Sequence, residues 1–144
     1  MTKKNHDADQ VRRDWLDRLQ RLIDDVRSWA SADDWVARQI EINKQDSTLG
    51  PYKAPALLLQ AEATCVLLEP IARSVPGVSG VVDLYLMPAY DDIARLHLED
   101  DGWHIEYRSP LSMEAGSPHE PEPKLLTAAV LREVLDEMKK NVVH

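Results

Sequence analysis

Two histidines on neighbouring predicted strands are the residues whose types and spacing come closest to a chemical site. In the hairpin described below, His97 and His104 lie opposite each other on one face, and Glu106 shares that face. Two histidines and a glutamate are a recurring ligand set for transition metals. The competing interpretation is a solvated face with two ordinary polar histidines, and we favour it. The sequence therefore names His97, His104 and Glu106 as candidate metal ligands, but we expect no bound metal and no other cofactor.

An acidic block surrounds these histidines. Residues 81–108 carry seven acidic side chains and two arginines. A calcium loop aligned on Gly102 would need an acid at its first position and a glutamate at its twelfth, where the chain has His97 and Arg108. The acids at 91–92 and at 99–101 lie at opposite ends of a predicted strand, about 20 Å apart, so they cannot share one ion. We interpret the block as the solvated turns of a hairpin.

The remaining reactive residues lack the partners that catalysis needs. Cys65, the single cysteine, lies in an apolar run, which indicates a buried and inert thiol. Asp83 lies in the middle of a predicted strand and would be a functional candidate if it were buried with a perturbed pKa; such an acid more often pairs locally. The sequence contains no glycine-rich phosphate loop, serine elbow or HExxH motif. We name no catalytic residue, and we regard an enzyme as the less favoured class.

Composition limits the class of protein. The 144 residues include 25 acidic and 17 basic side chains, for a net charge of −8, in a length that suits one domain. Such a charge would repel a phosphate backbone or an anionic membrane. One cysteine excludes an internal disulfide and suits a reducing compartment. With no apolar N-terminal stretch and no run of membrane-spanning length, we expect a cytoplasmic protein that binds neither nucleic acid nor membrane.

An amphipathic helix is the most strongly patterned element. We expect residues 1–8 to be a flexible polar leader and Asp9 to cap a helix that continues to about residue 30. Apolar residues recur at helical spacing along one stripe, namely Trp15, Leu19, Leu22, Val26 and Trp29. Such a stripe covers a sheet or a second helix equally well. Because excess apolar surface usually becomes a subunit contact, we name Trp15, Leu22 and Trp29 as candidate interaction residues of a homodimer.

The middle of the chain predicts strands joined by short turns. We expect a strand at 35–42, a turn at 43–51, a turn at 74–80 and a strand at 81–88. Residues 54–73 allow two interpretations, because continuous apolar runs do not separate strands from a buried helix. We choose two strands that turn at 61–63 over a single helix from about 55 to 69.

The hairpin at 93–108 is specified by its charges as well as by its apolar alternation. A four-residue loop at 99–102 gives complementary pairs, with Leu98 opposite Trp103, Leu96 opposite Ile105 and Arg95 opposite Glu106. A two-residue Asp101-Gly102 loop, a favoured turn type, would place Arg95 opposite Arg108. We therefore choose the longer loop, with a core side formed by Trp103, Ile105, Leu96 and Leu98.

The C-terminal part predicts a connector and a second helix. Residues 109–124 are rich in proline and acid, and we expect a mobile connector there. A helix over about 125–141 has one apolar face, formed by Leu131, Val134, Leu135 and Met138. Together these elements predict a single α+β domain over 9–144, an antiparallel meander of about five to six strands flanked by an N-terminal and a C-terminal helix.

In charge and length the chain resembles small acidic bacterial adaptors, such as secretion chaperones and toxin-neutralising proteins. We therefore predict a non-enzymatic protein-binding module whose partners are a second copy of the chain or a basic or apolar protein. The alternative is a small-molecule-binding domain or a small enzyme with a pocket between helix and sheet. A cleft with converging polar groups would favour the alternative, and an exposed apolar patch would favour the binding module.

Overall fold

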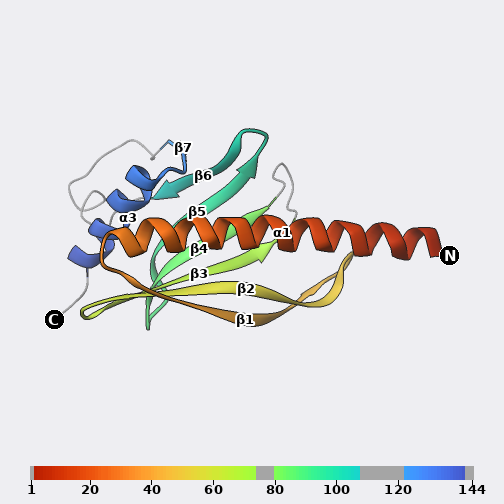
Figure 1. Ribbon diagram of the computed structural model, residues 1–144, viewed down its shortest axis with the longest axis horizontal. Coiled ribbons are helices and arrows are strands. Elements are labelled where there is room, and N and C mark those ends of the chain that lie inside the picture. Colours follow the sequence, from red (N-terminus) through yellow and green to blue (C-terminus); the bar gives the residue numbers. More distant parts are fainter. Residues whose placement is uncertain (1, 74–79, 108–121, 142–144) are drawn as a thin grey trace.

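The chain folds as one helix, a seven-stranded antiparallel sheet and a second helix (Figure 1). The computed structural model describes residues 2–73, 80–107 and 122–141. Neighbours in the sheet follow chain order, so the sheet is a simple meander. The elements are α1 (Thr2–Ala32), β1 (Val36–Asp46), β2 (Gly50–Ala61), β3 (Thr64–Ala72), β4 (Val81–Met87), β5 (Asp91–Glu99), β6 (Gly102–Tyr107), β7 (Lys124–Leu125) and α3 (Ala128–Lys140). The predicted α+β meander between two helices is confirmed, with seven strands instead of five or six.

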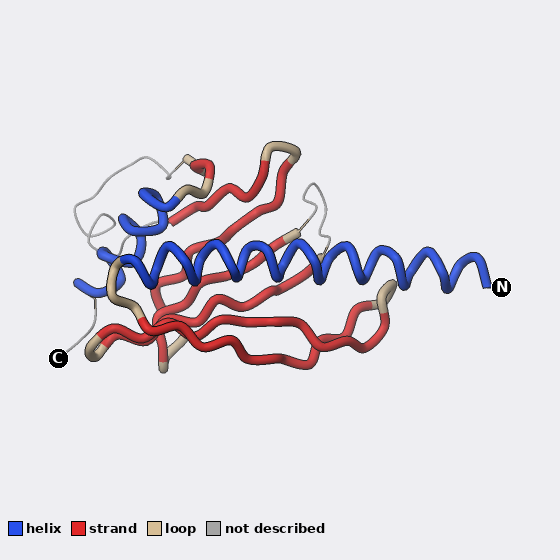
Figure 2. The backbone as a smooth tube through the Cα atoms, viewed as in Figure 1, coloured by secondary structure: helices blue, strands red, loops and turns tan. Residues whose placement is uncertain are grey.

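Both helices pack on one face of the sheet, and α1 crosses several strands (Figure 2). The apolar stripe of α1 is buried, including Trp15 at 2% exposure and Leu22 at 3%, and Trp29 is half-buried against the same core. Burying one such large side chain contributes roughly 1.5–3 kcal/mol, so this stripe is a major source of stability. The stripe therefore packs against the core of its own chain.

The N-terminal helix begins earlier than the sequence predicted. Residues 2–8, expected to be a leader, continue α1, and Asp9 lies within the helix instead of capping it. Asp9 accepts a hydrogen bond from Arg12 at 2.8 Å, one turn along the helix. This local pairing supports helix at a position where the composition had suggested its start.

The β2–β3 region confirms the two-strand interpretation, and the single helix over 55–69 is wrong. The strands turn at Glu62, which has φ 54, and Ala63. The predicted turn at 43–51 is shorter than expected, because residues 43–46 pair with residues 50–53 and only 47–49 remain as the turn. Asp46 closes it by accepting hydrogen bonds from the backbone N–H groups of Thr48 and Leu49 at 2.7 and 2.9 Å.

The β5–β6 hairpin has the predicted register. Leu98 pairs with Trp103, Arg95 with Glu106 and His97 with His104. Glu99 and Gly102 also pair, so Asp100 and Asp101 form the tip. The four residues predicted on the core side face the helices, with Leu96, Ile105 and Leu98 buried and Trp103 packed against the core.

The last helix begins at Ala128, later than the predicted start near residue 125, but it follows the predicted apolar pattern. Thr127 caps α3 by accepting a hydrogen bond from the backbone N–H of Val130 at 3.2 Å, and the four predicted residues of its apolar face are buried. Most of the predicted connector at 109–124 and of the predicted turn at 74–80 lies outside the described residues. Lys124, the last connector residue, belongs to β7 and pairs with Ile105. No helix in the described ranges has the length and apolar character to cross a membrane.

Candidate functional site

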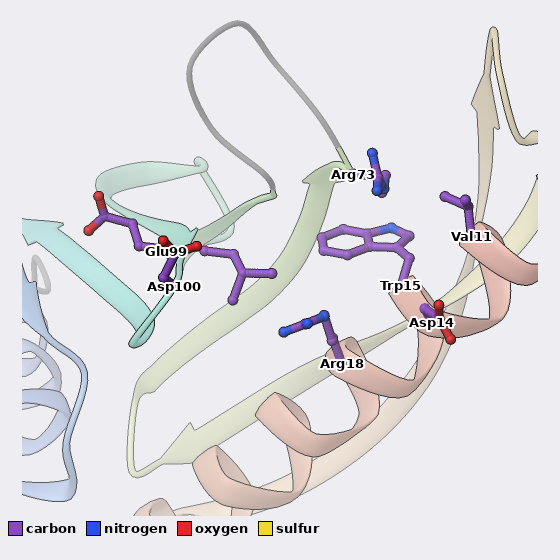
Figure 3. Close-up of a pocket in the computed structure, with 8 residues that line it drawn as sticks. Val11, Asp14, Trp15, Arg18, Arg73, Glu99 and Asp100 are labelled. Atoms are coloured by element: carbon purple, nitrogen blue, oxygen red, sulfur yellow. The ribbon is translucent and has the colours of Figure 1, made fainter.

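A pocket of about 280 Å³ lies between α1 and the tip of the β5–β6 hairpin (Figure 3). Helix α1 supplies one wall and the end of β5 the opposite wall, while Arg73, just after β3, closes a third side. The lining residues are Val11, Asp14, Trp15, Arg18, Arg73, Leu98, Glu99 and Asp100. Charged side chains of both signs therefore converge on one hollow.

Trp15 forms a fixed surface of this pocket. Its indole Nε1 donates a hydrogen bond to the Tyr52 hydroxyl at 3.2 Å, and its ring lies 6.2 Å from that of Trp103. The backbone of Gly80 approaches so closely that a Cβ there would lie 2.7 Å from the indole ring. Contacts on three sides therefore hold the ring in one orientation.

Arg18 and Arg73 lie on either side of the Trp15 ring (Figure 3). Neither makes a hydrogen bond or ion pair with any described residue, although the chain as a whole has an excess of acids. Two of the three acidic residues of the lining differ in this respect. Asp14 accepts a hydrogen bond from Gln10 at 3.0 Å, and Glu99 Oε2 lies 3.1 Å from His104 Nδ1. Asp100 has no partner among the described residues.

The predicted metal ligands are only partly brought together. His97 and His104 are cross-strand neighbours, as predicted, but Glu106 lies beside Arg95 in the register. Across the described ranges, the group of donor atoms lying within 4.8 Å of one another is Glu99, Asp101 and His104. The two ring nitrogens of His104 face different carboxylates, with Asp101 Oδ1 2.7 Å from Nε2.

This arrangement places one carboxylate beside each ring nitrogen of His104 at the hairpin tip. The two nitrogens of an imidazole point in different directions, so one ion cannot bind both. The hydrogen bond from His104 holds the pKa of Asp101 below its ordinary value, which shows that the carboxylate form is the one stabilised. The expectation that no metal is bound remains a prediction.

Asp83 is buried, and it is paired. Arg95 donates hydrogen bonds to both carboxylate oxygens, and the Tyr85 hydroxyl donates a third. Withdrawal of the Tyr85 hydroxyl from water, together with the nearby Asp83 carboxylate, raises the pKa of Tyr85. The hydrogen bonds to Asp83 raise the pKa of Arg95. Tyr85 and Arg95 are thereby held in the protonated forms that donate to Asp83, which indicates a structural role.

The face of the sheet opposite the helices, here called the outer face, carries apolar side chains. Alternation along each strand sends core residues such as Val66 and Leu84 toward the helices and their neighbours outward. Pairing places Leu58 beside Leu67 and Leu67 beside Tyr85, and the Tyr85 and Tyr90 rings meet edge to face at 5.3 Å. The partly or largely exposed apolar residues of this area, here called the outer patch, are Val36, Leu58, Cys65, Tyr85, Met87, Tyr90 and Ile93.

The outer patch includes the most exposed apolar side chains of the described chain. Val36 is 71% exposed, Tyr90 52% and Ile93 48%. Cys65, predicted to be buried, is only half-buried within the patch, and the partial burial raises the pKa of its thiol. The sequence did contain a signal for this surface. The runs at 57–59 and 66–68 are apolar at every position, which is typical of strands covered on both faces.

Comparison with known proteins adds no relationship. No protein-family model matches the chain, and no curated protein and no solved structure is significantly similar to it. The fold class is therefore established by the structure itself, and the function must be argued from its surfaces.

Proposed function

We propose that this protein is a non-enzymatic protein-binding module and that the outer patch is its binding surface. The observation that carries the proposal is an apolar area on a sheet face that no described helix covers. In an antiparallel sheet with one solvated face, apolar and polar residues normally alternate along each strand. The residues that point to the solvent are then polar. Contiguous exposed apolar surface on a small domain commonly marks an interaction site.

The partner that suits this surface is a protein with an apolar contact area and a basic surround. The chain carries a net charge of −8, which favours encounter with a basic protein. The same charge opposes contact between two copies. A homodimer formed by two outer patches is the other arrangement, and it would be an isologous contact.

We place the interaction in the cytoplasm, since a half-buried free thiol suits a reducing compartment. The stripe residues Trp15 and Leu22 are buried in the core of their own chain and are replaced in this proposal by the outer patch. Trp29 is half-buried against the same core.

A matched pair of variants tests the proposal. Ile93→Lys places a charge in the outer patch, and Leu125→Lys makes the same change at a similarly exposed apolar residue on β7. Affinity capture from the source cell, followed by mass spectrometry, should recover a partner with the wild type and with Leu125→Lys but not with Ile93→Lys. The recovered partner, purified and added back, should slow labelling of Cys65 by a thiol reagent.

Light scattering separates the two arrangements. The chain mass is 16.3 kDa, and a value twice as large, lost in Ile93→Lys, would identify the patch as a homodimer contact. A partner that binds both lysine variants equally, or leaves Cys65 labelling unchanged, would show that the outer patch is not the binding surface.

A further inference from the structure

The pocket between α1 and the hairpin tip is a second site, on the helix side of the sheet and independent of the outer patch. We propose that it binds a small zwitterion, a molecule with one carboxylate and one ammonium group, such as a free amino acid. The proposal rests on the position of two arginines, one free acid and one fixed aromatic ring.

The carboxylate of the ligand is recognised by Arg18 and Arg73. Both line the hollow, and neither is engaged by a described acidic side chain. Guanidinium groups donate paired hydrogen bonds that match a carboxylate in geometry and charge. Both guanidinium groups line the same hollow (Figure 3), so the hollow offers two cationic donors to a carboxylate.

The ammonium group is recognised by Asp100. The other two acids of the lining already have partners, Asp14 with Gln10 and Glu99 with His104. Asp100, at the hairpin tip, lies on the wall opposite α1 and lacks a described partner. An ammonium group beside Asp100 would meet a negative charge on one side of the hollow, while the carboxylate of the same ligand meets the arginines.

Net charge and volume support a small neutral molecule. A ligand with only negative charge would be repelled by a chain of charge −8, whereas a zwitterion meets no such long-range cost. The volume of about 280 Å³ is close to the lower end for ligand pockets. A volume of this size suits a small molecule such as an amino acid.

The pocket is already shaped for binding. Trp15 is held by its hydrogen bond to Tyr52, by Trp103 and by the close backbone of Gly80. A wall fixed before binding avoids part of the entropic cost of ordering side chains. Trp15 also serves as a reporter, because a ligand beside the ring shifts its indole N–H resonance.

The test is a nuclear magnetic resonance titration that follows the Trp15 indole signal, assigned with Tyr52→Phe, which removes its hydrogen-bond acceptor. The common L-amino acids are added one at a time. For the one that binds most tightly, the amide retains the ammonium alone and the N-acetyl derivative retains the carboxylate alone. Each should bind at least tenfold more weakly than the parent. A dipeptide of the same residue distinguishes a free amino acid from a peptide end.

Variants test which residues bind each charged group of the ligand. Arg18→Gln and Arg73→Gln should each weaken binding of the amino acid about tenfold, and Asp100→Asn should do so without weakening the N-acetyl derivative. Arg13→Gln, on the exposed face of the same helix, is the control and should bind as the wild type does. Failure of every amino acid to bind, equal binding of either single-charge analogue, or unchanged binding in the arginine variants would overturn the proposal.

Discussion

Arg95 on β5 donates two hydrogen bonds to the carboxylate of Asp83 on β4, Nε to Oδ1 at 2.8 Å and Nη2 to Oδ2 at 2.9 Å. The Asp83 side chain is only 3% exposed, whereas that of Arg95 is 50% exposed. The arginine therefore covers a buried charge with a group that stays in water. This pairing explains how an acid is tolerated within the outer face without forming a catalytic site.

Loss of Arg95 alone should lower the free energy of unfolding more than loss of both charges of the pair. Arg95→Met leaves the Asp83 carboxylate buried without its cation, and we expect a loss of about 2 kcal/mol in the free energy of unfolding. The double variant Asp83→Asn, Arg95→Met should be more stable than Arg95→Met alone. Urea denaturation measures both. Equal stability of the single and double variants would mean that the pair is screened by solvent.

Alkaline pH should destabilise the protein through Tyr85. Burial and the Asp83 carboxylate raise the pKa of Tyr85 above its usual value of 10.0, so the folded state holds the phenol proton more tightly than the unfolded state. This contribution is complete below about pH 10 and is lost as pH rises further. Urea denaturation between about pH 9 and pH 11 should show a steeper fall for the wild type than for Tyr85→Phe. Parallel curves would contradict this assignment.

Two adjacent leucines should distinguish the two faces of the sheet. Leu59 is fully buried against the helices, whereas Leu58 is half-buried in the outer patch. We expect Leu59→Ala to cost about 3 kcal/mol, because it opens a cavity in the core, and Leu58→Ala to cost about 1 kcal/mol or less. Thermal and urea unfolding provide the comparison. A reversed order would mean that β2 faces the other way.

Gly80 should not tolerate a side chain. A Cβ at this position would lie 2.7 Å from Cζ3 and 3.0 Å from Cη2 of Trp15, so the ring would have to move. We expect Gly80→Ala to cost about 1–3 kcal/mol and to shift the Trp15 indole resonance. Gly50→Ala is the comparison, because a Cβ there meets nothing within 4 Å and any cost comes from its φ of 75°. An unshifted Trp15 signal in Gly80→Ala would refute the close contact.

Purified protein should carry no stoichiometric metal at pH 7. Each ring nitrogen of His104 faces a carboxylate, at 3.1 and 2.7 Å, and the two nitrogens point in different directions, so one ion cannot use both. Elemental analysis of protein prepared without a histidine tag is the measurement. One zinc or nickel per chain, lost in His104→Ala and kept in His97→Ala, would instead establish a site formed by Glu99, Asp101 and His104.

The local elements were predictable because their signals lie close together in the chain. The stripe of α1 and the face of α3 follow from helical spacing, and the β5–β6 register follows from the pairing of Arg95 with Glu106. The start of α1 was missed because the polar residues 2–8 give no apolar periodicity. The turn at 43–51 was predicted too long because turn-forming composition there is overridden by strand pairing.

The two candidate sites depended on contacts that no local pattern encodes. Arg18 and Arg73 are distant in sequence, and they line the same hollow only because α1 lies across the sheet. The apolar runs of β2 and β3 place apolar residues on both faces of the sheet, although from sequence they served only to weigh two strands against a helix. Only the packing of α1 and α3 on the same side decided which face became core and which became the outer patch, because two helices that share one side bury only the surface beneath them.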